Sequence, residues 1–245
     1  MRRFHPAPAG EARLVCLPHA GGSASFFFPV SRALAPAVEV LAVQYPGRQD
    51  RRHEPPVDNI PDLADRIIDA LRQLDDRPLA LFGHSMGAVL GYEVALRLRD
   101  AGLPPPAHLF VSGRRAPSSD RRYQMPQVSD AQIVAELRTL SGTDTTMLAD
   151  PEVLAMILPV VRADYRAVEK YRHDPDRRLD CPVTVLTGDS DPRVSIDEAR
   201  AWAEHTVGPT DLHVLPGGHF FLVDQRDDVV AILLRQLAGT TPVYG

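Results

Sequence analysis

The sequence predicts an α/β protein built on one mostly parallel sheet flanked by helices. The alternation of two kinds of segment supports this. Apolar runs with strand character alternate with segments in which apolar residues recur at helical spacing. We expect strands at 13–17, 38–43, 79–83, 108–112, 183–187 and 212–215, and helices near 25–35, 60–75, 86–100, 196–206 and 227–237. The alternation breaks once, because about seventy residues between the fourth and fifth strands contain no strand pattern.

The composition is that of one globular domain spanning residues 1–245. With 44% hydrophobic residues, a chain of this length can bury one sizeable core. The net charge of −5 provides no basic field for nucleic acid, so we expect no nucleic-acid partner. Cys16 and Cys181 fall beside predicted buried strands, which favours free thiols in a reducing compartment. Two cysteines imply no disulfide or metal framework, and we expect no cofactor.

No segment has the pattern of a secretory leader or a membrane span. Residues 1–8 carry positive charge, but no apolar segment follows them. No later run approaches the ~18 consecutive apolar residues that a transmembrane helix needs. We therefore expect a cytoplasmic protein with no membrane partner.

The first predicted strand, 13–17, leads into a glycine-rich turn at residues 18–23. Taken alone, this segment is an ordinary glycine turn. In hydrolases with a serine nucleophile, a turn in this position presents a backbone N–H to the oxyanion that develops during the reaction. The meaning of the turn therefore depends on whether a nucleophile is found elsewhere in the chain.

The helix expected at 60–75 illustrates the helical signal. Asn59 can cap its N-terminus, and Pro61 suits its first turn. Apolar residues then recur on one face, at Leu63, Ile67, Leu71 and Leu74. The segment is therefore expected to pack that face against the sheet.

A candidate nucleophile follows the third predicted strand, in the motif Gly83-His84-Ser85-Met86-Gly87. The preceding run reads as a strand and the following one as a helix, so Ser85 falls at the sharp turn between them. A serine there has strained backbone geometry and an exposed hydroxyl, and glycine at both flanks avoids clashes with the helix. Because the five-residue pattern also arises by chance, the assignment depends on finding partners for the serine.

The insertion between the strands near 108–112 and 183–187 carries two predicted helices. Ser129 can cap the first, while Asp150 and Pro151 open the second, in which Pro159 should introduce a kink. An insertion at this point lies over the strand ends, so we expect a helical lid at about 118–175 that forms a substrate chamber. A helical hairpin that only adds core is the alternative.

The expected partners of Ser85 follow it in the chain order Ser, Asp, His. The strand at 212–215 leads into a glycine turn containing His219, which can serve as general base; a solvated loop histidine is the alternative. The strand at 183–187 ends at Asp189 and Asp191, and either acid could orient the imidazole. The loop position favours Asp191, while Asp189 could cap the turn through its side chain.

A serine nucleophile gives the first glycine turn its role. The N–H of the residue after the nucleophile, Met86, is one expected donor to the oxyanion. The turn after the first strand supplies the second, which we assign to Ala20. Four parts in the right order, each at a strand end, indicate a serine hydrolase.

Six motifs spread from about Arg13 to Leu222 occur together: Pro18-His19-Ala20-Gly21-Gly22, Tyr45-Pro46-Gly47-Arg48, Gly83-His84-Ser85-Met86-Gly87, Ser112-Gly113-Arg114-Arg115-Ala116-Pro117, Gly188-Asp189-Ser190-Asp191 and Gly217-Gly218-His219-Phe220-Phe221. This combination resembles a type II thioesterase, a discrete enzyme of α/β-hydrolase fold that works beside modular polyketide and nonribosomal peptide synthases. The resemblance implies that Ser85 is the nucleophile, Asp191 the acid, His219 the base and 118–175 the lid. It also prefers Asp191 over Asp189.

The resemblance further implies the reaction. It is hydrolysis of acyl thioesters on the phosphopantetheine arm of an acyl or peptidyl carrier protein, which removes stalled or aberrant acyl groups through an acyl-serine. A carboxylesterase or lipase acting on free small molecules and an acyltransferase would use the same triad. A non-catalytic accessory that binds acyl carriers is the alternative outside enzymes.

Arginines in loops expected on the active-site side could dock an acidic carrier protein. These residues are Arg48, Arg51, Arg52, Arg114, Arg115, Arg121 and Arg122. The alternative is that an arginine-rich chain places arginine on any solvated loop.

Overall fold

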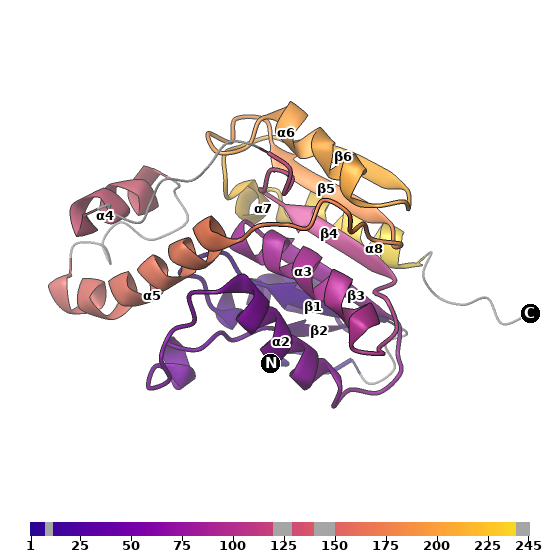
Figure 1. The fold of residues 1–245 in the computed structure, drawn as a ribbon, viewed down its shortest axis with the longest axis horizontal. Helices are drawn as coiled ribbons and strands as arrows, with labels where there is room; N and C mark the ends of the chain where they lie inside the picture. Colours follow the sequence, from indigo (N-terminus) through magenta and orange to yellow (C-terminus); the bar gives the residue numbers. More distant parts are fainter. Residues whose placement is uncertain (8–11, 120–128, 140–149, 239–245) are drawn as a thin grey trace, which may run out of the picture.

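The computed structural model describes residues 1–7, 12–119, 129–139 and 150–238. Six strands form one sheet in which every neighbouring pair is parallel: β1 (Ala12–Leu17), β2 (Val38–Ala42), β3 (Leu79–His84), β4 (His108–Ser112), β5 (Val183–Gly188) and β6 (Thr210–Leu215). Their order across the sheet is β2-β1-β3-β4-β5-β6 (Figure 1). The predicted parallel sheet is confirmed.

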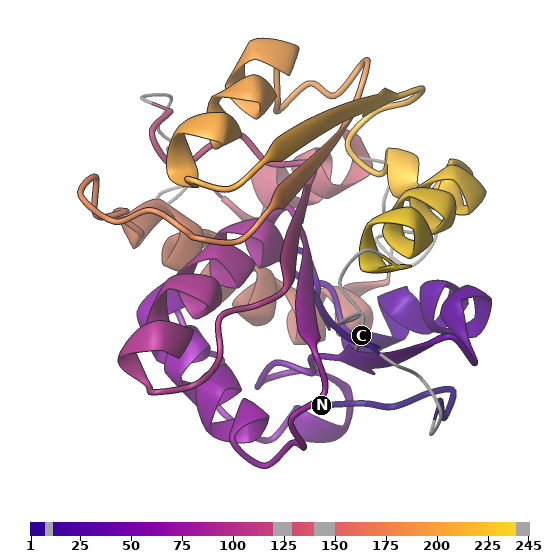
Figure 2. The same ribbon diagram turned by 90° about the vertical axis from the view of Figure 1, so that its right-hand side faces the viewer.

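Helices cover both faces of the sheet, which Figure 2 shows from its edge. One face carries α2 (Ile60–Leu71), α3 (Met86–Asp100), α6 (Ile196–Arg200) and the 3₁₀ segment η4 (Ala201–His205). The other carries the 3₁₀ segment η1 (Ala24–Phe27), α1 (Phe28–Leu34), α7 (Phe221–Asp224) and α8 (Arg226–Ala238). A further short 3₁₀ segment, η2 (Gln49–Arg51), follows β2. Each face thus has its own apolar core, because a parallel sheet must be buried on both sides.

The helix α2 forms for the reasons that the sequence indicated. The Asn59 side chain accepts a hydrogen bond from the Asp62 N–H at 3.2 Å, which caps the first turn. Leu63, Ile67 and Leu71 are buried on its inner face. The helix ends at Leu71, earlier than expected, and Leu74 packs against the same core from beyond the helix.

The insertion between β4 and β5 contains α4 (Asp130–Thr139) and α5 (Pro151–Lys170), which extend away from the sheet in Figure 1. Ile133 and Leu137 of α4 pack against Val161 and Tyr165 of α5. The helix α5 is continuous through Pro159. Residues 120–128 and 140–149 of the expected lid lie outside the described residues. Within the described part, no helix has the length and apolar character needed to cross a bilayer.

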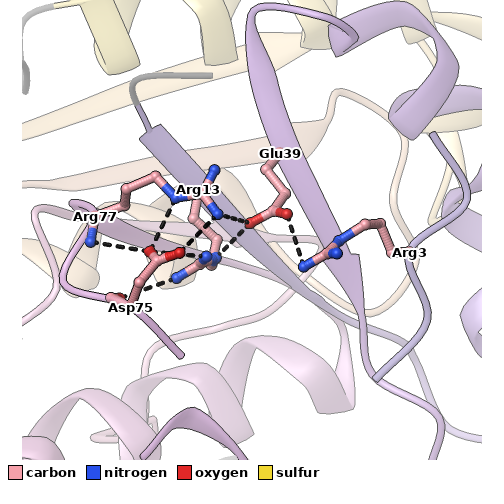
Figure 3. A network of polar contacts seen from close by, with 5 residues as sticks. All are labelled: Arg3, Arg13, Glu39, Asp75 and Arg77. Atoms are coloured by element: carbon pink, nitrogen blue, oxygen red, sulfur yellow. Dashed lines mark hydrogen bonds and ion pairs between the residues drawn. The ribbon is translucent and has the colours of Figure 1, made fainter. Parts of the chain in front are cut away.

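A buried ion-pair network joins the N-terminal ends of β1 and β2 (Figure 3). The glycine turn follows the opposite, C-terminal end of β1. Arg13 and Glu39 are neighbours in the strand register, are 2% and 3% exposed, and pair at 2.7 Å. Glu39 also pairs with Arg3 and Arg77, while Arg13 reaches Asp75 at 3.1 Å. The hydrogen bond from Arg77 lowers the pKa of the Asp75 carboxyl well below its usual range. The network therefore satisfies two charges that the sheet removes from water.

We expect the Glu39→Ala substitution to cost about 3–5 kcal/mol of unfolding free energy, because it removes the buried carboxylate and leaves the Arg13 charge with only the exposed Asp75 as a partner. Urea unfolding at neutral pH measures this. Asp180→Ala is the matched control, since it removes an ion pair with Arg99 whose two side chains are both 61% exposed; it should cost less than ~1 kcal/mol. Equal costs for the two variants would contradict this account.

Candidate active site

Ser85 lies at the turn from β3 into α3 with a backbone conformation that L-residues rarely adopt. Its φ is +55° and its ψ is −111°. A Cβ at Gly83 would lie 2.0 Å from the Gly87 carbonyl oxygen, and one at Gly87 would lie 1.9 Å from the Leu17 carbonyl oxygen. Neither position therefore tolerates a side chain, because both contacts are with backbone. The predicted elbow geometry is present.

His219 and Asp191 meet Ser85 at the carboxyl edge of the sheet. The Ser85 Oγ lies 3.1 Å from His219 Nε2, and His219 Nδ1 lies 2.8 Å from Asp191 Oδ2. Because a carboxylate only accepts, Nδ1 carries the proton and Nε2 is free to accept from the serine hydroxyl. The other Asp191 oxygen accepts from the Arg193 N–H at 2.8 Å, which fixes the carboxylate.

Asp189 occupies the position that the sequence left as its alternative. Its side chain is exposed, and its Oδ1 accepts from the Gly217 N–H at 3.0 Å. This contact ties the loop after β5 to the turn that carries His219. Asp189 is thus a turn residue, while Asp191 contacts the imidazole.

The two expected oxyanion donors, Met86 and Ala20, come from different segments of the chain. Met86 is the first residue of α3, where a backbone N–H has no partner within the helix. Ala20 lies in the glycine turn after β1 and lines the same cavity as Ser85 and His219. Ala20 therefore lines the cavity beside Ser85, and the Met86 N–H directly follows the serine in the chain.

The cavity above Ser85 has a volume of about 120 Å³ and lies under the inserted helices. The insertion contributes an apolar wall from Leu137, Val153, Ile157, Val161 and Tyr165. Other lining residues come from loops at the strand ends: His19, Gly21, Arg193 and Phe220. An apolar group attached to a carbonyl at Ser85 would fit this wall. Within the described ranges, no group of three or more His, Cys, Asp or Glu is arranged to hold a metal ion.

Two further histidines, His84 and His19, lie near His219. The His84 ring centre lies 5.2 Å from that of His219 and 5.8 Å from that of His19. Burial lowers the pKa of His84 well below its ordinary value and lowers the pKa of His19 to about 3. Both rings are therefore neutral at physiological pH. His84 contacts the Ser112 hydroxyl at 3.1 Å, whereas His219 contacts a carboxylate that can stabilise its cation.

Two of the arginines named as candidates for docking a carrier protein are buried. Arg48 and Arg115 are each only 7% exposed, so neither offers its charge to a docking partner. Arg48 is instead paired with Asp164 of α5. Arg114 is half-buried, and its carbonyl accepts from Trp202.

The remaining loop arginines differ in their surroundings. Arg51 is half-buried and pairs with Glu54, whereas Arg52 is exposed. Arg121 and Arg122 lie outside the described residues.

Sequence reasoning missed Asp164, which is fully buried in the inserted helix. A signal for it exists in the chain. Asp164 lies three residues after Val161 and four before Val168, on the apolar stripe that faces inward. A charge on such a stripe requires a buried partner, which the stripe alone does not identify.

Comparisons with known proteins match these observations. The family model described as a thioesterase domain matches residues 12–237. The chain is 52% identical over 229 residues to a probable cadicidin biosynthesis thioesterase of Streptomyces griseus and covers 63% of that protein's length. It is 48% identical to thioesterase PikA5 of Streptomyces venezuelae, of which it covers 82%. Both alignments include 94% of this chain.

Solved structures show the same similarity in three dimensions. The type II thioesterase BorB from the borrelidin biosynthetic cluster superposes with a TM-score of 0.89 at 50% identity, covering 96% of each chain. YbtT, a type II thioesterase from the yersiniabactin pathway, superposes with a TM-score of 0.87 at 31% identity over 98% of each chain. These matches span most of the chain, and the chain belongs to the thioesterase-domain family.

Proposed function

We propose that this protein hydrolyses acyl thioesters through an acyl-serine intermediate. The hydrogen-bonded chain from Ser85 through His219 to Asp191 is the observation that supports this most strongly. The strained serine turn exposes the hydroxyl, and the buried carboxylate stabilises the imidazolium that forms. The same features would be unnecessary in a protein that only binds acyl groups.

In the proposed acylation step, His219 Nε2 takes the Ser85 proton as Oγ attacks the thioester carbonyl carbon. The carbonyl oxygen becomes an oxyanion, to which the Ala20 and Met86 N–H groups donate. Collapse of this intermediate breaks the carbon–sulfur bond, and the leaving thiolate takes up the proton that His219 gained from Ser85, so that the imidazole is neutral again. A thiolate is a good leaving group, so the barrier lies mainly in attack on the carbonyl.

In deacylation, His219 takes a proton from a water molecule, whose oxygen attacks the acyl-serine carbonyl. The second oxyanion uses the same two N–H groups. Collapse breaks the bond to Ser85 Oγ, which recovers its proton from His219. The products are a free carboxylic acid and regenerated enzyme.

The proposed substrate is an acyl group on the phosphopantetheine arm of an acyl or peptidyl carrier protein. Relatives named as type II thioesterases of polyketide and peptide biosynthetic pathways support this. In this role the enzyme acts in the cytoplasm beside a polyketide or nonribosomal peptide synthase and removes stalled or aberrant acyl groups. The apolar wall of the cavity suits the acyl chain.

The two acids after β5 should separate in their effects on turnover. Asp191→Asn should lower kcat by roughly 10³- to 10⁴-fold, because His219 loses the partner that sets its tautomer and stabilises its cation. Asp189→Asn keeps an oxygen that can accept from Gly217, so it should change stability by at most about 0.5 kcal/mol and leave turnover near wild type. Steady-state kinetics on one thioester measure both. A larger loss from Asp189→Asn would reverse the assignment.

Carrier-bound substrates should be hydrolysed with a higher kcat/KM than the same acyl groups on a small thiol. Contacts with the carrier contribute binding energy that a short thioester lacks. The measurement compares acyl-carrier proteins with acyl-N-acetylcysteamine thioesters over several acyl lengths. Equal efficiency on both would count against a carrier substrate and favour a small-molecule esterase.

A further inference from the structure

The glycine turn after β1 is held by three buried side chains from elsewhere in the chain. The Tyr45 hydroxyl donates to the Pro18 carbonyl at 3.1 Å. The Arg48 guanidinium donates to the Gly22 carbonyl at 3.0 Å. The Asp164 carboxylate accepts from the Gly21 N–H at 2.7 Å. We call Tyr45, Arg48 and Asp164 the turn anchors.

The turn anchors also bind one another. Arg48 donates to both Asp164 oxygens at 2.8 Å, in the two-pronged geometry that guanidinium and carboxylate groups favour. Its guanidinium carbon lies 5.0 Å from the centre of the Tyr45 ring. Tyr45 is 1% exposed and Asp164 is fully buried, so the set is shielded from water. It therefore forms one rigid unit instead of three separate contacts.

The three anchors hold the turn that contains Ala20, the proposed oxyanion donor. In the sequence, Ala20 lies between Pro18, whose carbonyl is bound by Tyr45, and Gly21, whose N–H is bound by Asp164. The Gly21 N–H that Asp164 holds belongs to the peptide next to the one that supplies the Ala20 N–H. Gly21 has a φ of +76°, and a Cβ there would lie 2.8 Å from Val161 Cγ2, so the turn lies directly against α5. Small movements of the turn would change the direction of the Ala20 N–H.

A structural role alone accounts poorly for this arrangement. A buried ion pair contributes little net stability, because the desolvation of both charges offsets their attraction. Here the carboxylate contacts the backbone of the turn as well as the guanidinium, and it comes from the inserted helix α5. A buried network of this kind is well suited to holding the backbone of the turn in the orientation that the reaction needs.

We propose that Tyr45, Arg48 and Asp164 are positioning residues that hold the Ala20 N–H toward the oxyanion. This inference rests on the proposed acyl-serine mechanism and goes beyond it by assigning the oxyanion site three supporting side chains. It also makes the inserted helix a part of that site, because Asp164 belongs to α5. A variant that disturbs the anchors should thus weaken binding of the oxyanion more than binding of the substrate.

The test uses two variants of the full-length protein and one control. Asp164→Asn removes the charge that pairs with Arg48, and Tyr45→Phe removes a single oxygen and keeps the ring. Asp130→Asn, the control, disrupts an ion pair with Arg162 between the inserted helices and changes none of the side chains that hydrogen-bond to the turn. Thermal unfolding and circular dichroism establish that each variant is folded. If Asp164→Asn does not fold, Tyr45→Phe carries the test.

Turnover is measured with p-nitrophenyl butyrate, which acylates the serine without a carrier protein. Two inhibitors distinguish binding of the oxyanion from binding of the substrate. One is an alkyl trifluoromethyl ketone, which adds to Ser85 and forms an oxyanion. The other is a thioether analogue without a carbonyl. Asp164→Asn should lower kcat roughly 10- to 100-fold with KM within about threefold. Tyr45→Phe should lower it about 3- to 10-fold, and Asp130→Asn should leave it unchanged.

The trifluoromethyl ketone should bind the two anchor variants more weakly, by the same factor as the loss in kcat, while the thioether binds all proteins equally. The proposal would be overturned if the folded anchor variants had wild-type kcat, or if their affinities for the two inhibitors fell by the same factor. Hydrolysis of p-nitrophenyl butyrate but not of carrier thioesters by the wild type would instead contradict the proposed function and leave this test intact.

Discussion

The backbone of Ser85 is the constraint on which the rest of the site depends. Its positive φ turns the chain from β3 directly into α3, and this requires glycine at 83 and 87, where the neighbouring backbone leaves no room for a Cβ. The hydroxyl is thereby fixed at the carboxyl edge of the sheet. Because β5 and β6 lie beyond β4 in the same parallel sheet, their carboxyl ends open onto the same edge. The loops that follow β5 and β6 carry Asp191 and His219, and they place His219 against the serine and Asp191 against His219.

Near Ser85, the buried charged groups of Asp191, Arg48 and Asp164 each have a polar partner. His84 and His19 are buried near His219 as neutral rings, so in the proposed mechanism the positive charge falls on His219, next to the Asp191 carboxylate. Arg48 and Asp164 are also buried near the site, and they satisfy each other and the backbone of the glycine turn. The inserted helix that carries Asp164 therefore contributes both an apolar wall and a polar contact to one cavity.

The sequence predicts local features well and long-range pairings poorly. Strand positions, the Asn59 cap and the elbow around Ser85 follow from periodicity and from glycine placement, which are properties of neighbouring residues. The two acids after β5 differ by two residues in one loop, so periodicity could not separate Asp189 from Asp191. The burial of Arg48 was missed because its partner, Asp164, lies 116 residues away. Only the charge of Asp164 on an apolar helix stripe hinted at a buried partner.

The most direct test of the account is the detection of the acyl-serine itself. The protein is mixed with an acyl thioester, quenched with acid within milliseconds to seconds, digested and analysed by mass spectrometry. We predict that the peptide containing Ser85 gains the mass of the acyl group minus one hydrogen, and that Ser85→Ala shows neither this adduct nor turnover. An adduct on another residue, or thioester hydrolysis by folded Ser85→Ala at a rate near that of the wild type, would contradict the central claim.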